Sequence, residues 1–380
     1  MKRIRWYILA LLLFTCCNRI SEVESARGEG KGQSYAKYAS GFEVNDFGTY
    51  RVLHVFDPWQ SSKGVTFSYV LANKREFVPD SLEHLTFIKT PVNRVVTLST
   101  THVAMIDQLG KGGSIKGVSG TGFIYNSRLR SRIEVGDVKE VGYDQGLNYE
   151  IIVGLQPDVL FMYGVDGSVM ATSQKLAELK VPVIFCGDYL EPHPLGKAEW
   201  IRFLSLFYNL EERADRFFQE IDSVYNSYKS LTEQTKNRPL VLTGLPWKDT
   251  WYMAGGESFA ATLIKDAGGE YLWADSHSAE AIPLDLESVY ARAVKAEIWI
   301  NPGAATSLNE LQNFDQRFTE LGVIQSGMIF NNNERLNTTG GNDYWESGTV
   351  RPDLVLADLI KVFHPDLLTD HRLFYYRQLK

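Results

Sequence analysis

The sequence predicts an α/β fold made of two lobes, each a parallel sheet covered by helices, with one long helix between them. Short apolar, β-rich runs alternate with helical stretches after residue 91, and the same alternation starts again after residue 238. Alternation with short connections is typical of parallel sheets with helices on their faces. The longest helical stretch, residues 196–229, separates the two series. A chain of 380 residues is also longer than one hydrophobic core usually serves.

The first lobe is expected to contain four strands and three helices. Its strands are short buried runs such as RVVTLS, and its helices end at turn residues such as Gln156-Pro157. The expected strands are residues 94–99, 114–118, 158–163 and 181–186, and the expected helices are 102–110, 148–155 and 172–179.

The connecting stretch contains two helical segments that break near Asn209. In the second segment, apolar residues such as Ala214, Phe218 and Ile221 recur at helical spacing. The α/β alternation then resumes, with strands expected at residues 240–244, 297–301 and 328–330 and helices at 258–267, 285–294, 315–321 and 353–363.

The N-terminus has the pattern of an export signal. Three cations in the first five residues precede the unbroken apolar run 6–14, which is too short to span a bilayer as a helix. Cys16 and Cys17 follow at once, and a cysteine closing a signal peptide resembles a bacterial lipobox. Either cysteine is a candidate for lipidation, which would anchor the protein to a membrane.

The predicted organisation has six parts. They are the signal peptide with its lipobox (1–17), a flexible tether rich in Gly, Ser, Glu and Lys (18–40), a β-rich extension (41–90), the first lobe (91–209), the linker helix (210–237) and the second lobe (238–380). Within the extension, residues 49–56 and 65–72 predict a hairpin or small antiparallel sheet.

Composition and motifs narrow the classes of function. The net charge of −7, with no basic run, argues against a nucleic-acid partner. The chain has no G-x-S-x-G elbow, H-E-x-x-H or Walker A motif, so no enzyme is indicated. Of three cysteines only Cys186 lies beyond the signal, in an apolar run that predicts a buried, inert thiol.

Four blocks of sequence resemble the class III periplasmic binding proteins for cobalamin, haem and ferric siderophores. They are RVVTLSTTHVAMIDQLG, GYDQGLNYEIIVGLQPDVLF, MAGGESFAATLIKDAGGEYLW and IPLDLESVYARAVKAEIWINPG, and the similarity runs from about residue 92 to residue 368. The resemblance implies two lobes that face each other across a ligand cleft, with a rigid helix limiting closure to a small motion.

The same resemblance implies a function and partners. The protein would be an exported, periplasmic, lipid-anchored substrate-binding protein of an ABC importer, working with a permease and its ATPase. Its ligand would be a metal-containing small molecule, either cobalamin, haem or a ferric siderophore, and it would need no intrinsic cofactor.

Glu150 and Glu287 occupy corresponding places in the two lobes. The resemblance implies that both dock onto arginines of the permease. Each lies early in a short predicted helix, so favourable capping by a carboxylate is the alternative explanation.

The ligand is expected among the loops that follow the strands' carboxyl ends. These loops are rich in aromatic residues, whose flat faces suit a macrocycle, and they contain histidines suited to a haem iron or corrinoid cobalt. The predicted ligand-binding residues are His102, Phe123, Tyr125, Tyr163, Tyr189, Trp247, Trp251, Tyr252, Tyr344 and Trp345; His193 and His277 are further candidate metal ligands.

Several alternatives stay open. Histidines with a carboxylate could bind bare zinc or manganese instead. An anionic siderophore would favour arginine, for which Arg128, Arg130 and Arg351 are candidates. The sequence does not decide whether Glu199 faces ligand or solvent. An exported sensor or an enzyme on the same fold is the competing class of function.

Overall fold

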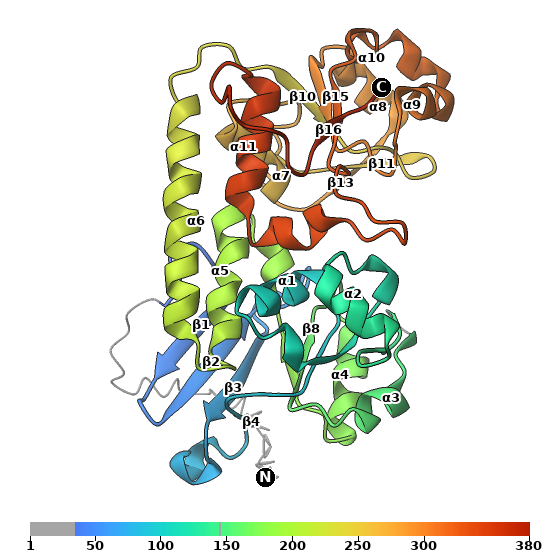
Figure 1. Ribbon diagram of the computed structural model, residues 1–380. Coiled ribbons are helices and arrows are strands. Elements are labelled where there is room, and N and C mark those ends of the chain that lie inside the picture. Colours follow the sequence, from blue (N-terminus) through green and yellow to red (C-terminus); the bar gives the residue numbers. More distant parts are fainter. Residues whose placement is uncertain (1–34, 144–145) are drawn as a thin grey trace, which may run out of the picture.

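The computed structural model describes residues 35–143 and 146–380 and shows two α/β lobes, one above the other, with a long helix along one side (Figure 1). The predicted fold class is confirmed. The signal peptide, Cys16, Cys17 and residues 18–34 of the expected tether lie outside the described residues.

The first lobe is built on a five-stranded parallel sheet in the order β7-β6-β5-β8-β9. Its strands are nearly all apolar because helices cover both faces. The strands are β5 (Val95–Thr97), β6 (Ile115–Val118), β7 (Lys139–Glu140), β8 (Val159–Met162) and β9 (Val183–Phe185). The helices are α1 (Thr100–Gln108), α2 (Ser127–Glu134), α3 (Tyr149–Gly154) and α4 (Val169–Glu178).

Two helices connect the lobes, α5 (Pro194–Ser205) and α6 (Glu211–Thr232). The predicted break near Asn209 is present, and this residue has a left-handed φ of 53°. In α6 the apolar positions Ala214, Phe218, Ile221 and Tyr225 are buried, as their helical spacing predicts. This helix packs against α5 and α11 (Pro352–Phe363), and it therefore contacts both lobes.

The second lobe has a five-stranded sheet in the order β12-β10-β14-β15-β16, parallel except for the edge strand β16. Its strands are β10 (Leu240–Thr243), β12 (Glu270–Tyr271), β14 (Ile298–Ile300), β15 (Ile329–Asn331) and β16 (Arg377–Gln378). A separate antiparallel ribbon consists of β11 (Thr250–Met253) and β13 (Ile282–Asp285). The helices are α7 (Phe259–Asp266), α8 (Leu286–Ala293), α9 (Leu308–Phe314), α10 (Gly322–Ser326) and α11. The stretch 315–321, expected as an α-helix, is a 3₁₀-helix over Gln316–Glu320.

The N-terminal extension forms its own four-stranded sheet, β1 (Phe42–Asp46), β2 (Tyr50–Phe56), β3 (Thr66–Ala72) and β4 (Thr86–Lys89). The strands β2 and β3 make the expected antiparallel pair. This sheet packs on the edge strand β9, where the backbone N–H of Phe185 donates to the Tyr69 hydroxyl at 3.1 Å. The extension is therefore joined to the first lobe by both hydrogen bonding and aromatic packing against Phe185.

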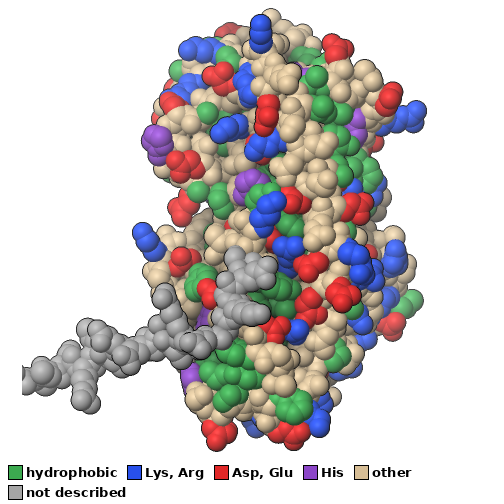
Figure 2. Space-filling model, turned by 90° about the vertical axis from the view of Figure 1, so that its left-hand side faces the viewer, with side chains coloured by type: hydrophobic (Ala, Val, Ile, Leu, Met, Phe, Trp, Pro, Cys, Tyr) green, Lys and Arg blue, Asp and Glu red, His purple; other side chains and the backbone are tan. Residues whose placement is uncertain are grey.

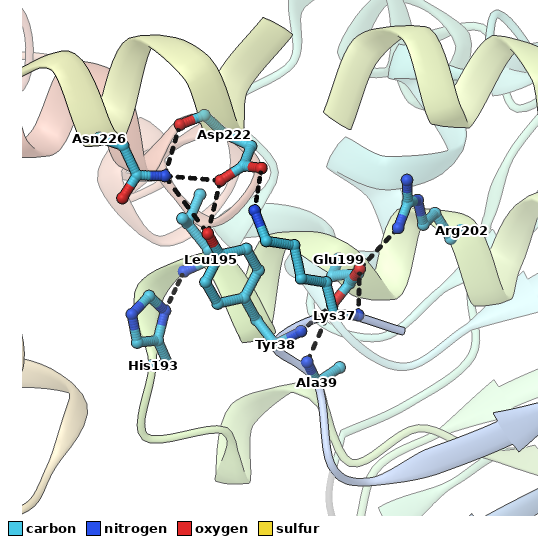
Figure 3. Close-up of polar contacts among 9 residues, drawn as sticks. All are labelled: Lys37, Tyr38, Ala39, His193, Leu195, Glu199, Arg202, Asp222 and Asn226. Carbon is cyan, nitrogen blue, oxygen red and sulfur yellow. Dashed lines mark hydrogen bonds and ion pairs between the residues drawn. The ribbon is translucent and has the colours of Figure 1, made fainter. Parts of the chain in front are cut away.

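Residues 35–41, which we call the N-terminal segment, are held by two buried carboxylates, of which Figure 3 shows Glu199. Glu199, in α5, accepts backbone N–H bonds from Lys37, Tyr38 and Ala39 at 2.8, 2.7 and 2.9 Å. Glu191 accepts the backbone N–H groups of Ser40 and Gly41 at 3.0 and 2.9 Å.

The same segment contacts the linker helix. Asp222 in α6 accepts hydrogen bonds from the Lys37 ammonium and the Tyr38 hydroxyl, both at 2.7 Å (Figure 3). The expectation that residues 18–40 form one flexible tether is wrong for residues 35–40. The expectation was wrong because composition does not show that Glu199 and Glu191, far along the chain, accept the backbone N–H groups of these residues. Glu199 faces neither ligand nor solvent, since its side chain is fully buried.

Within residues 35–143 and 146–380, no helix is both long and apolar enough to cross a bilayer. The face that lies to the left in Figure 1 carries interspersed acidic and basic side chains, so neither sign of charge dominates it (Figure 2).

Candidate functional site

A cavity of about 240 Å³ lies between the two lobes at the carboxyl ends of β5, β6 and β8. We call it the central cavity. Its first-lobe lining comes directly after those strands, where the carboxyl ends of neighbouring parallel strands meet. The lining residues are Leu98, Ser99, Thr100, Ser119, Phe123, Tyr143 and Tyr163 from the first lobe, with Gly340, Asn342 and Trp345 from the second.

Three of the predicted aromatic residues, Phe123, Tyr163 and Trp345, line this cavity together. Phe123 and Trp345 are large apolar side chains left 52% and 58% exposed, so their faces are free to contact a ligand. Tyr143 is a fourth aromatic member that the sequence reasoning missed, although it opens a block already singled out. Its ring lies 5.8 Å from that of Phe123.

The second-lobe wall comes from residues 333–347, a segment between β15 and α11 that we call the strap. It lies between the two lobes (Figure 1). Gly340, at its tip, has φ of 96°, a conformation that glycine adopts without a steric penalty. Asn337 Nδ2 donates to the Ile124 carbonyl at 2.9 Å, and the Thr339 hydroxyl donates to the Gly122 carbonyl at 2.9 Å.

A buried carboxylate of the strap, Glu346, joins the two lobes. The Glu346 side chain is 2% exposed and accepts the backbone N–H groups of Tyr125 and Asn126 at 2.7 and 2.9 Å. Burial raises the pKa of Glu346 to about 7, although these two N–H bonds oppose the rise. Nearby Asp343 and Asp107 raise the same pKa further.

On the other side of this contact lies a second inter-lobe cavity of about 670 Å³, which we call the arginine cavity. Arg128, Arg130 and Arg351, the three arginines considered from the sequence, line it together with Arg335. Arg335 and Arg351 are already paired with carboxylates, at 2.6 Å to Asp343 and 2.8 Å to Asp353 respectively. The other charged lining groups include Asp107, Asp343 and Glu346, so the cavity has mixed charge.

The histidines do not converge on the central cavity. His102, expected in a cleft-side loop, lies inside α1 and is fully buried, with its ring nitrogens 3.1 Å from Thr97 Oγ1 and 3.2 Å from Asp188 Oδ1. That placement was wrong because the helix begins two residues earlier than expected. His193 caps α5 and stacks on Tyr38, and His277 is exposed beside Glu257. Among the described residues, no group of three or more His, Cys, Asp and Glu side chains is arranged to hold a metal ion.

Two of the predicted aromatic ligand contacts are core residues. Trp251 is 1% exposed and packs on Trp299 and Phe318. It was expected in a loop, but it lies in β11, where alternation turns Trp251 inward and Tyr252 outward. Tyr344 is 6% exposed and its ring meets those of Tyr375 and Tyr376. Their expected exposure at loop tips was therefore wrong.

The remaining four predicted aromatic residues lie around the cleft without lining the central cavity. Tyr125 lines the arginine cavity, with the Arg335 guanidinium 5.2 Å above its ring. Tyr189 makes an edge contact with Tyr163. Trp247 and Tyr252 are more than half exposed beside or within the β11–β13 ribbon.

The two acidic residues of the predicted docking pair are both exposed in the first turn of a helix. Glu150 lies in α3 and Glu287 in α8, and both helices lie on the right of Figure 1, across from α6. Glu287 also pairs with Arg317 at 2.9 Å.

Residues 95–318 match the family model for "Periplasmic binding protein". This is more than half of the chain, and the chain therefore belongs to that family. The class III resemblance is confirmed.

Relatives and solved structures agree with this placement. An uncharacterized lipoprotein of Methanocaldococcus jannaschii is 26% identical over 314 residues, covering 78% of this chain and 72% of the relative. A periplasmic heme-binding protein from Roseiflexus sp. RS-1 is similar in fold, with a TM-score of 0.54 and 20% identity, covering 72% of this chain and 99% of the other. An ABC-type Fe³⁺-hydroxamate transport protein from Saccharomonospora viridis DSM 43017 has a TM-score of 0.54 and 16% identity, covering 72% and 94%.

Proposed function

We propose that this chain is the substrate-binding lipoprotein of an ABC importer for cobalamin or an iron complex, either haem or a ferric siderophore. The observation that carries the proposal is that aromatic side chains of both lobes line one cavity at the carboxyl ends of the first-lobe strands. Membership of the periplasmic binding protein family and the lipoprotein relative support export and anchoring through Cys16 or Cys17. The permease and its ATPase would be the partners.

The ligand would be a rigid, partly flat molecule held mainly by apolar contact with Phe123, Tyr163 and Trp345. Such a molecule needs more room than the central cavity of about 240 Å³, because sites for drug-sized ligands measure about 300–1,000 Å³. The arginine cavity of about 670 Å³ lies just beyond the contact between Glu346 and Tyr125. We infer that a macrocycle occupies both spaces and that its binding displaces the strap from the first lobe.

Trp345→Ala is expected to weaken binding of the true ligand about ten-fold or more, as loss of a central aromatic contact usually does. Trp247→Ala provides the matched control, because Trp247 is similarly exposed but does not line the central cavity. Calorimetric titration of the full chain in detergent with cyanocobalamin, haemin and a ferric hydroxamate would measure both. Failure of all three to bind, or equal loss in the two variants, would contradict the proposed site.

Replacing Glu150 and Glu287 together with Ala is expected to cut ligand uptake by cells at least ten-fold while leaving ligand affinity unchanged. The reason is that both carboxylates are exposed, one on each lobe, and would meet cations of the permease. The control replaces Glu178 and Glu334, which are also exposed, one on each lobe. Normal uptake by the double variant would refute the docking role.

Among these ligands, an anionic ferric siderophore is favoured by the four arginines of the arginine cavity. An anionic ferric chelate would find donors there, since a guanidinium suits carboxylate and related oxygen ligands. Binding of the ferric chelate but not of haemin or cyanocobalamin, weakened by Arg128→Ala more than by Trp345→Ala, would favour this class.

A further inference from the structure

The extension lies wholly before residue 95, where the family match begins, so the family assigns it no role. Its β2–β3 loop nevertheless lines a cavity together with Glu280 of the second lobe. The sheet order puts β9 at the edge of the first lobe, and the extension packs against that edge strand.

Where the extension meets β9 there is a third cavity, of about 480 Å³, which we call the extension cavity. Four parts of the chain build it: the β2–β3 loop, the segment after β9, the N-terminal segment and the second lobe. The loop contributes Trp59, Gln60 and Lys63 among others, and the second lobe contributes Glu280. A cavity that needs both lobes and the extension changes shape whenever the lobes move.

A pair of tyrosines leads from the segment that lines the extension cavity to the central cavity, since Gly187 and Leu190 line the extension cavity and Tyr189 lies between them in the sequence. Tyr163 lines the central cavity, and its ring makes an edge contact with Tyr189 at 6.1 Å. The Tyr189 hydroxyl donates to the Gly164 carbonyl at 2.5 Å. Burial raises the pKa of Tyr189 to about 12. A hydrogen bond with the backbone of Gln60 lowers this pKa, and the negative charge of Glu280 raises it. The β2–β3 loop therefore lies close to Tyr189, whose ring contacts Tyr163 of the central cavity.

The loop is held rigidly on the first lobe. Asp57 accepts the backbone N–H of Gly64 at 2.6 Å, and the Ser62 hydroxyl accepts the backbone N–H of Trp59 at 3.1 Å. The Trp59 ring is buried against Phe185 of β9, with ring centroids 5.8 Å apart. Gln60 and Lys63, in contrast, are exposed. A rigid loop with free polar side chains is suited to contacting a ligand at little entropic cost.

We propose that the β2–β3 loop is a third wall of the ligand cleft, and that Gln60 and Lys63, facing Glu280 of the second lobe, contact amide or carboxylate groups on the periphery of the bound molecule. This inference rests on the proposed function, because it assumes that the central cavity holds the ligand. It makes the extension a determinant of which complex is bound rather than a structural appendage.

The binding test replaces Gln60 and Lys63 together with Ala and uses Lys74→Ala with Glu76→Ala as a control in the same extension, where both residues are exposed. Titrations of the full chain with cyanocobalamin, haemin and a ferric hydroxamate should show a loss of about five-fold or more for the probe that binds, which is what loss of one or two polar contacts produces. The control should bind like the wild type. If Trp345→Ala weakens binding and the loop variant does not, the third wall is refuted while the proposed function stands. Failure of every probe to bind overturns both.

A second experiment first tests, before any ligand is added, whether the loop lies close to the second lobe. Lys63→Cys with Glu280→Cys should be joined by a short bis-maleimide, because both side chains line one cavity. Cys186 is buried and burial raises its thiol pKa, so it should not compete. The joined protein should bind the probe at least five-fold more slowly, because the wall and the second lobe can no longer separate. A folded double variant that fails to crosslink would overturn the inference.

Discussion

Glu199→Ala is expected to lower the free energy of unfolding by about 3 kcal/mol, within the range for removing one partner of a buried charged group. Its carboxylate is fully buried and accepts three backbone N–H groups of the N-terminal segment as well as the Arg202 guanidinium at 2.7 Å. Alanine would leave all three part-buried N–H groups without this acceptor. Urea denaturation of the full chain measures the effect.

The control for that experiment is Glu212→Ala, a substitution of the same residue type where the side chain is 95% exposed. It should leave the urea midpoint unchanged. Hydrogen exchange should also show the backbone of residues 37–39 becoming unprotected in Glu199→Ala. An unchanged midpoint in that variant would mean that the N-terminal segment is not part of the cooperative fold.

The second large effect concerns pH and Glu346. Because burial raises its pKa from 4.5 to about 7, the ionised carboxylate is disfavoured in the closed, folded protein. The contribution of Glu346 to the free energy of unfolding is therefore fully present below about pH 4.5, and it is lost as the pH rises through about 7. At about 1.4 kcal/mol per pKa unit, this group changes the free energy of unfolding by about 3–4 kcal/mol across that window.

Comparison with Glu346→Gln isolates the effect, since the amide does not titrate. As the pH rises from 5 to 8, the free energy of unfolding measured in urea should fall more for the wild type than for Glu346→Gln. The groups that face Glu346 are Asp343 on the strap, Asp107 on α1 and the four arginines of the arginine cavity, and both proteins retain them. Glu334→Gln, on the exposed part of the strap, should follow the wild type. Parallel profiles for wild type and Glu346→Gln would contradict the prediction.

The same group connects pH to ligand exchange. The contact of Glu346 with Tyr125 and Asn126 lies between the central and arginine cavities, and a ligand that fills both must displace it. Because burial disfavours the ionised carboxylate in the closed protein more than its two N–H bonds favour it, we expect ligand to enter and leave faster above pH 7 than at pH 5.

Local patterns were enough to predict much of the fold. The apolar runs at β5, β8, β9, β10 and β14 are visible without the structure because strands buried on both faces are uniformly apolar. Asn209 marked the break between α5 and α6, since a residue with left-handed φ ends a helix. The two-residue strands β7 and β12 were missed because such short strands have no periodicity to detect.

The aromatic residues show where local pattern stops being informative. Trp251 follows the polar residue Thr250 and Trp345 precedes the polar residue Glu346, and both tryptophans were expected to face the ligand. One is 58% exposed in the central cavity, and the other is 1% exposed beneath Trp299. The difference comes from one additional strand, β11, whose alternation decides which ring turns inward.

By itself, the sequence determined the class of fold and the order of the strands β5, β6, β8, β9, β10, β14 and β15. It also determined the membership of a binding-protein family and the positions of Glu150 and Glu287 at the starts of helices. Apolar runs, helical spacing and short motif blocks are each visible from neighbouring residues. Only the tertiary structure decided that Glu199 holds the N-terminal segment, that Glu346 joins the lobes and that the β2–β3 loop shares a cavity with Glu280 of the second lobe. Glu199 lies about 160 residues from the segment it holds, and Glu346 lies about 220 residues from Tyr125 and Asn126. Glu280 lies about 220 residues from Gln60. A side chain's partner across such a distance is set by how the lobes pack, and periodicity carries no information about it.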